Sequence, residues 1–198
     1  AWDLGRNDMM VIVMFQIVGR ELRIVDEYHN TGEDLEHYYN KLVEIRKDKG
    51  YAYGTHVLPH DAKVTDLSSP ISRKARLREL GLRRMRVLKR TADVNSDIEQ
   101  VRKAIPHMSI DPVTAGYILK AMGRYTKKWD DMLGTFKDKP LHNEWSNPAD
   151  AFRYMVMARM HDTTGGVDSS SADSDGGPGA PRGGRRRRLG NVVDGMAM

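Results

Sequence analysis

The sequence predicts an α/β domain, with a mixed β-sheet flanked by helices and a disordered C-terminal tail. Three observations lead to this prediction. Residues 9–18 form a nearly continuous apolar run, which is typical of a strand covered on both faces. Short apolar runs then alternate with segments of helical periodicity, and long crossovers of this kind favour a mixed sheet. From residue 163 onward Gly, Ser, Asp, Pro and Arg dominate, so we assign residues 1–162 to the domain and 163–198 to the tail.

The elements follow in order from local patterns. Three opening strands are expected, and the second and third are joined by a tight turn at Gly19-Arg20. The best-marked helix is 33–49, where apolar residues recur at helical spacing and Gly50 follows basic residues. Asp111-Pro112 and Asn147-Pro148 each combine a capping residue with a proline, so each predicts a helix start. The expected strands are 2–4, 9–18, 21–29, 53–58 and 84–88, and the other expected helices are 70–80, 94–105 and 149–160.

Composition excludes several classes of protein. The 198 residues include no cysteine, so disulfides and thiolate metal sites are impossible. No GxxxxGK[ST] string occurs, so this chain should not hydrolyse ATP. The longest apolar stretch is too short to cross a bilayer and no targeting pattern opens the chain, so we expect neither a membrane protein nor a secreted one. Strand-like sequence begins almost at residue 1, which suggests a piece of a longer chain. The net charge of +5 favours a polyanionic partner.

Three aspartates stand at the edges of apolar elements: Asp3, Asp61 and Asp150. Mg²⁺ and Mn²⁺ prefer oxygen ligands, so a few carboxylates gathered at one sheet edge could bind them. Two such ions can assist an in-line displacement at a phosphodiester. Each acid also has a structural explanation. Asp61 could cap a turn, Asp150 could complement a helix dipole, and Asp3 could be an edge residue. An acid in so apolar an opening segment would nevertheless be costly if it were buried without a partner.

Four motifs carry a family resemblance. They are Trp-Asp-Leu-Gly at 2–5, Leu-Pro-His-Asp-Ala at 58–62, Phe-Lys-Asp-Lys-Pro-Leu-His at 136–142 and Ser-Asn-Pro-Ala-Asp-Ala-Phe-Arg-Tyr at 146–154. Residues 1–160 thereby resemble the C-terminal nuclease domain of the large terminase subunit of tailed double-stranded DNA bacteriophages. The resemblance implies a ribonuclease H-like fold. It also implies an endonuclease that cuts concatemeric viral DNA with two Mg²⁺ or Mn²⁺ ions.

Carried over residue by residue, the resemblance makes Asp3 the central metal ligand, Asp61 the second and Asp150 the third. Many relatives have a histidine three positions before the last aspartate, where this chain has Asn147. Asparagine can orient water or DNA but cannot shuttle a proton at neutral pH. Asp8 and Asp26 could be auxiliary ligands, but a structural role is the favoured interpretation for each.

The resemblance also implies partners: double-stranded DNA, a motor ATPase domain, the small terminase subunit and the portal, in the host cell cytoplasm. A cluster of basic residues is the candidate DNA-binding surface, and a solvated helix face is its alternative. Two other functions stay open: another ribonuclease H-like nuclease (transposase- or resolvase-like), or a catalytically degenerate module that binds DNA or the portal. The candidate DNA-binding residues are Arg73, Lys74, Arg76, Arg83, Arg84 and Arg86.

Aromatic and histidine residues are assigned structural roles. Trp129, Trp145 and Phe136 are expected in the core or anchoring a loop. His56 and His60 have a spacing that could suggest zinc, but no cysteine or third ligand accompanies them, so a zinc site is not expected.

Overall fold

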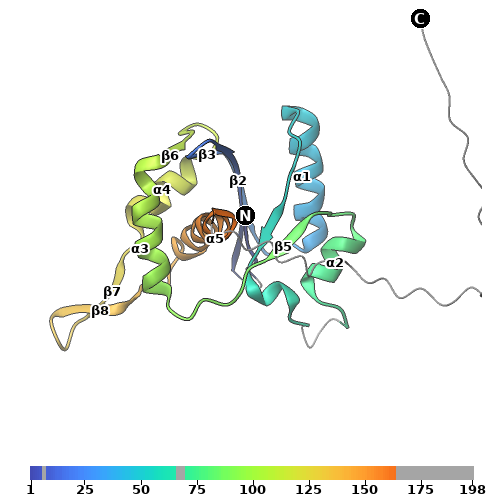
Figure 1. The fold of residues 1–198 in the computed structure, drawn as a ribbon. Coiled ribbons are helices and arrows are strands. Elements are labelled where there is room, and N and C mark those ends of the chain that lie inside the picture. Colours follow the sequence, from blue (N-terminus) through green and yellow to red (C-terminus); the bar gives the residue numbers. More distant parts are fainter. Residues whose placement is uncertain (6–7, 66–69, 164–198) are drawn as a thin grey trace, which may run out of the picture. The chain divides into compact units, whose positions relative to one another are not determined.

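A central four-stranded sheet organises the domain (Figure 1). The computed structural model describes residues 1–5, 8–65 and 70–163, with side chains described up to residue 160, and the predicted tail lies outside this part apart from its first residue. The strand order is β1–β2–β3–β6. β1, β2 and β3 are antiparallel neighbours, and β6 is parallel to β3. The bounds are β1 (Trp2–Asp3), β2 (Met9–Val18), β3 (Glu21–Thr31) and β6 (Met108–Ile110).

Two short strands form a parallel pair beyond β1: β4 (His56–Leu58) and β5 (Met85–Val87). Backbone hydrogen bonds continue the pairing at both ends. His56 N–H donates to the Arg84 carbonyl at 2.8 Å, and Leu88 N–H donates to the Leu58 carbonyl at 2.9 Å. Because the strands are parallel, the residues that follow β4 and those that follow β5 leave at the same end.

Helices cover both faces of the sheet, and side chains cap the first turns of three of them. Asp34, Ser72 and Asp93 accept hydrogen bonds from the first turns of α1, α2 and α3, and Gly50 ends α1 at a φ of 69°. Two short 3₁₀ helices, η1 (His60–Lys63) and η2 (Ile105–His107), follow β4 and α3. The helices are α1 (Leu35–Lys49), α2 (Arg73–Glu79), α3 (Val94–Ala104), α4 (Gly116–Arg124) and α5 (Ser146–Thr163).

β2 divides the core into two clusters, which explains its continuous apolar run. Val11 and Val13 pack with α3, α4 and α5 on one face, whereas Ile12 and Met14 pack with α1 and α2 on the other. Figure 1 shows α5 against one side of β2 and α1 on the opposite side. The prediction of a strand covered on both faces is therefore confirmed.

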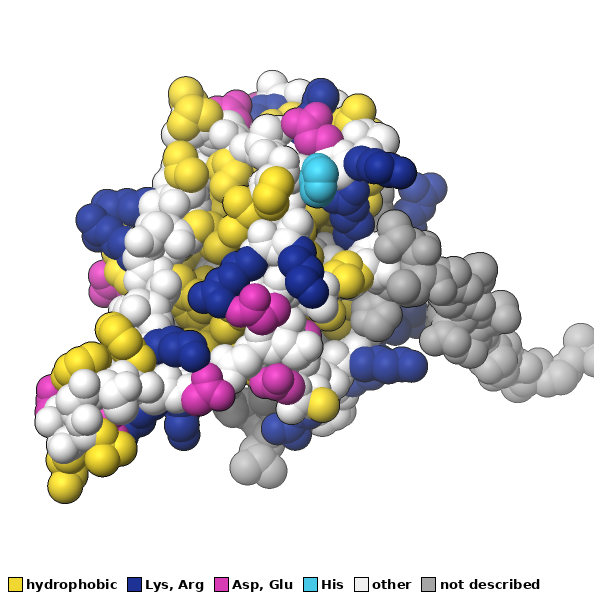
Figure 2. Space-filling view, turned by 60° about the vertical axis from the view of Figure 1, so that its left-hand side comes forward, with side chains coloured by type: hydrophobic (Ala, Val, Ile, Leu, Met, Phe, Trp, Pro, Cys, Tyr) yellow, Lys and Arg dark blue, Asp and Glu magenta, His cyan; other side chains and the backbone are white. Residues whose placement is uncertain are grey.

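A hairpin of β7 (Lys127–Asp130) and β8 (Thr135–Pro140) projects from the body of the domain and was not predicted (Figures 1 and 2). Its tip is apolar and exposed, since Met132 is 95% and Leu133 74% accessible. Trp129 and Phe136 lie edge to face across the hairpin with ring centroids 4.9 Å apart, and both are exposed. These two residues therefore lie outside the core and pack across the hairpin, which fits the expected alternative of a loop anchor, whereas Trp145 is buried.

Two predicted helix starts are displaced. Asp111 does not begin a helix: its Oδ1 accepts from the N–H groups of Val113 and Thr114, and α4 starts only at Gly116. α5 starts earlier than predicted, at Ser146, so the Asn-Pro pair lies within its first turn, where proline is tolerated. In the described ranges, no helix is long and apolar enough to span a membrane.

Candidate metal centre

The three predicted acids lie on β1, on α5 and on η1, the 3₁₀ helix that follows β4, and α5 packs against both β1 and β4. Asp3 pairs in register with Val11 of β2, whose side chain belongs to the core cluster on the α5 face. Residues directly opposite one another in a sheet share a face, so Asp3 points toward α5. Asp150 lies on α5, which packs against β1, β2 and β4. Asp61 lies in η1, immediately after β4.

Asp3 is affected by the charges of the other acids. Burial raises the pKa of Asp3 well above its usual value, and the charges of Asp150, Asp8 and Asp61 raise it further, whereas Arg153 acts in the opposite direction. Tyr154 is affected by two of the same acids, because burial raises its pKa and the charges of Asp150 and Asp3 raise it further. A carboxylate that feels three others is a place where positive charge is stabilised.

Two arginines balance part of this negative charge. Arg73 donates from Nη1 to Asp61 Oδ2 at 3.2 Å and to the Leu4 carbonyl at 2.9 Å, which ties α2 to the end of β1. Arg153 donates to Asp150 Oδ1 from Nη2 at 3.0 Å and from Nε at 3.3 Å. Arg73, a predicted DNA-binding residue, is thus bonded to one candidate metal ligand, and Arg153, which no local sequence pattern singles out, is bonded to another.

One oxygen in this group has no partner in the described structure. Asp61 Oδ1 is buried and accepts no hydrogen bond from any described residue. A buried carboxylate oxygen without a donor is costly unless a cation satisfies it. Across residues 1–5, 8–65 and 70–163, no three His, Asp or Glu side chains are close enough to form a metal cluster. The arginine bonds to Asp61 and Asp150 hold these carboxylates in their present positions. The all-oxygen donor set nevertheless suits Mg²⁺ or Mn²⁺.

Asn147 fastens the start of α5 to the start of β2. It is buried, and its Nδ2 donates to the Met9 carbonyl at 2.7 Å and to Asp8 Oδ2 at 3.1 Å. Gly5 leaves no room for a side chain here, because a Cβ would lie 2.5 Å from the Met9 carbonyl oxygen. Asn147 therefore positions the segment that carries Asp8.

The predicted DNA-binding residues are dispersed. Arg76 lies near Glu36 and Glu79 on the outer surface of α2, and Arg86 donates to the Ala158 carbonyl on α5. Arg83 and Arg84 precede β5 and so lie at the end of the parallel pair opposite to Asp61. Lys74, on α2 next to Arg73, is partly exposed.

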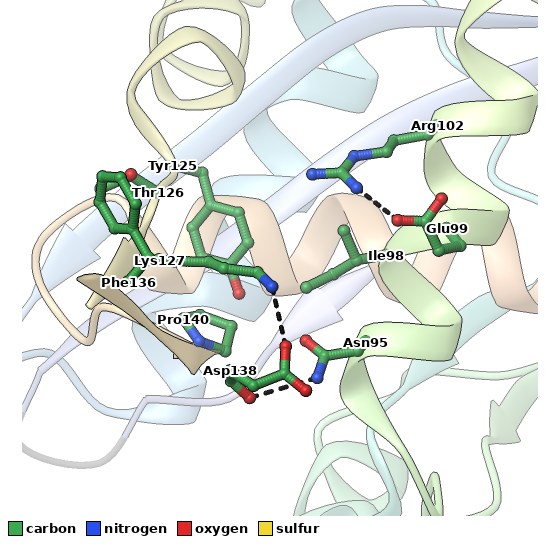
Figure 3. Close-up of a pocket in the computed structure, with 10 residues that line it drawn as sticks. All are labelled: Asn95, Ile98, Glu99, Arg102, Tyr125, Thr126, Lys127, Phe136, Asp138 and Pro140. Atoms are coloured by element: carbon green, nitrogen blue, oxygen red, sulfur yellow. Dashed lines mark hydrogen bonds and ion pairs between the residues drawn. The ribbon is translucent and has the colours of Figure 1, made fainter. Parts of the chain in front are cut away.

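A cavity of about 400 Å³ lies between α3 and the β7–β8 hairpin (Figure 3). Its basic side chains are paired with acids: Arg102 with Glu99, and Lys127 with Asp138 at 2.8 Å. Because these basic side chains are neutralised by acids, the cavity lacks the excess positive charge of a phosphate-binding pocket. Tyr125, which lines the cavity, is coupled to the acidic group, because burial and then the charge of Asp150 raise its pKa to about 12.

Separate segments thus place carboxylates near one edge of the sheet, and helices cover both of its faces. No family model matches the chain, and no curated protein matches it. Among solved structures, the chain is similar to the large terminase of a thermophilic bacteriophage, in complex with ADP, with a TM-score of 0.60 and 20% identity over 80% of this chain. It spans 38% of that protein's length.

The chain is also similar to the g2p large-terminase nuclease domain of bacteriophage SPP1, solved with bound Mn. The TM-score is 0.57 and the identity 19%, over 80% of this chain and 84% of that one. The fold is therefore that of a large-terminase nuclease domain. The resemblance seen in the motifs and the predicted fold class are both confirmed.

Proposed function

We propose that this chain is the metal-dependent endonuclease domain of a phage DNA-packaging terminase, and that it hydrolyses phosphodiester bonds of concatemeric double-stranded DNA. One observation carries the proposal. Asp3 on β1 lies on the sheet face that packs against α5, which carries Asp150. α5 also packs against β4, which leads directly into η1 and Asp61. Burial and then the charges of Asp150, Asp8 and Asp61 raise the pKa of Asp3, which is consistent with this placement. The fold of a large-terminase nuclease domain supports it, as does the Mn bound to the SPP1 domain.

Asp3, Asp61 and Asp150 would hold the cations, with Asp3 as the central ligand. Two Mg²⁺ or Mn²⁺ ions, when bound, supply stabilisation of charge on the attacking and leaving oxygens of the displacement. Asp61 Oδ1 accepts no hydrogen bond from a described residue and would be one ligand atom for a cation. Hydrogen bonds from Arg73 and Arg153 orient the carboxylates of Asp61 and Asp150. Asn147 and Asp8 support the site by fixing the segment before β2.

DNA would approach at the strand ends where Asp61 lies. Lys89 and Arg90 follow β5 at that end and are exposed, so they join Arg73 and Lys74 as candidates for phosphate contacts. In this proposal Arg83 and Arg84 contribute less, because they lie at the other end. The motor ATPase domain, the small terminase subunit and the portal are the proposed partners, in the host cell cytoplasm.

Nicking of supercoiled plasmid tests the proposal. With Mn²⁺ or Mg²⁺ the protein should nick the plasmid, and EDTA should stop the reaction. Asp61→Asn should lower the rate at least about 100-fold, since even groups that only support metal ligands are worth 10- to 100-fold. Asp48→Asn, an exposed acid near the end of α1, removes the same charge and should leave the rate unchanged.

One outcome would contradict the proposal, and two others would favour a different function. Nicking by Asp61→Asn at the wild-type rate would contradict it. Salt-dependent DNA binding without nicking under any metal condition would favour the degenerate binding module. Preference for branched or transposon-end DNA over linear duplex would favour another nuclease of the same fold.

A further inference from the structure

A buried ion pair links the candidate metal centre to α3. Arg153 Nη1 donates to Asp97 Oδ2 at 2.9 Å, and both side chains are less than one tenth exposed. The same guanidinium donates to Asp150 through its other nitrogens. The centroid of the Tyr154 ring lies 4.8 Å from the guanidinium carbon, and this contact helps to fix the guanidinium plane. Arg153 thus forms hydrogen bonds with two acids, Asp97 on α3 and Asp150 on α5.

The hydrogen bonds to Asp150 end on a single oxygen. Nε and Nη2 of Arg153 both donate to Oδ1, and neither donates to Oδ2. The guanidinium therefore fixes the orientation of the carboxylate and leaves Oδ2 for another partner. Such outer partners commonly orient metal-ligating side chains.

Charge balance explains why the second acid matters. A lone buried arginine would compete with a divalent cation for Asp150 and would repel the cation. Asp97 offsets that positive charge from the opposite side, on α3. We propose that Asp97 is a positioning residue, which acts through Arg153 to keep the Asp150 carboxylate oriented and available for a divalent cation. This inference rests on the proposed function and adds a residue that touches neither the cation nor DNA.

Calorimetric titration with Mn²⁺ in the absence of DNA tests the inference. Asp97→Asn can still accept the hydrogen bond from Arg153 but has no charge, so the dissociation constant for Mn²⁺ should rise about 10- to 100-fold. Asp97→Glu restores the charge and should recover most of the affinity. Glu99→Gln removes one exposed acid from the same helix and should leave the affinity unchanged.

The dissociation constant and the stoichiometry of Mn²⁺ binding together distinguish a positioning role of Asp97 from a purely structural one. If Asp97 only stabilised the fold, Asp97→Asn would lower the fraction of binding-competent protein at an unaltered dissociation constant, and the inference would be overturned. A positioning role instead predicts a weaker constant at full stoichiometry, with the cleavage rate recovering at high Mn²⁺. Wild-type affinity in Asp97→Asn would overturn this inference alone. Absence of Mn²⁺ binding by the wild type would overturn both it and the proposed function.

Discussion

Asp3→Asn is expected to abolish metal-dependent cleavage and, in metal-free buffer, to raise the melting temperature. Cleavage should fall at least about 100-fold, because the variant lacks the central ligand. Stability should rise because the Asp3 carboxylate is desolvated and lies among the charges of Asp150, Asp8 and Asp61. Most substitutions at partly buried positions destabilise, so a gain in stability would be specific to this arrangement.

The pH dependence of stability gives the sign of the effect. The folded-state pKa of Asp3 lies above its usual value of 3.8, so the folded protein binds this proton more tightly than the unfolded chain does. The free energy of unfolding of the wild type therefore falls as the pH rises from the usual pKa of 3.8 to the folded-state pKa. Asp3→Asn has no proton to lose and lacks this fall. Thermal unfolding in EDTA at about pH 5 and about pH 8 should show the larger advantage of the variant at the higher pH. A variant that is less stable than the wild type at both pH values would contradict the account.

Arg153→Met is expected to destabilise the domain by about 3–5 kcal/mol, because it leaves Asp97 buried without a partner. Total stabilities of single domains are of the order of 5–15 kcal/mol, so the loss should be evident as a large shift in urea-induced unfolding. The double variant Asp97→Leu with Arg153→Met removes both charges and should recover most of the lost stability. It also keeps the prediction testable if the single variant does not fold.

An exposed pair on the same helix provides the control. Arg102 and Glu99 form an ion pair on α3, and both side chains are more than half exposed. Arg102→Met should therefore change stability by less than about 1 kcal/mol. Equal losses for Arg102→Met and Arg153→Met would show that burial of the Asp97–Arg153 pair contributes nothing.

The parts of the fold that the sequence predicted well are those with local causes. The continuous apolar run of β2 reflects burial on both faces, and the start and end of α1 are marked by the Asp34 cap and Gly50. Asp3, Asp61 and Asp150 stay predicted ligands, and the sequence indicates them because each stands at the edge of an apolar run. Their convergence depends on α5 packing against β1 and β4, and the sequence suggested it only through the family resemblance.

Other features depend on contacts between distant segments. Asp111-Pro112 has the pattern of a helix start. However, Asp111 N–H donates to the Ile24 carbonyl and Thr114 Oγ1 to the Val25 carbonyl, so β3 holds the segment as a turn. Asp97 and Arg153 are 56 positions apart, and no local pattern joins them. The exposed aromatic pair of the β7–β8 hairpin could not be distinguished from core residues by composition alone.

The central claim is that acids from β1, η1 and α5 bind divalent cation together, and anomalous scattering from a crystal of this chain grown with Mn²⁺ tests it most directly. The account predicts manganese density in contact with carboxylate oxygens of Asp3, Asp61 and Asp150, at about 2.0–2.3 Å. Ordered carboxylates without manganese between them, or manganese bound only elsewhere on the domain, would contradict it.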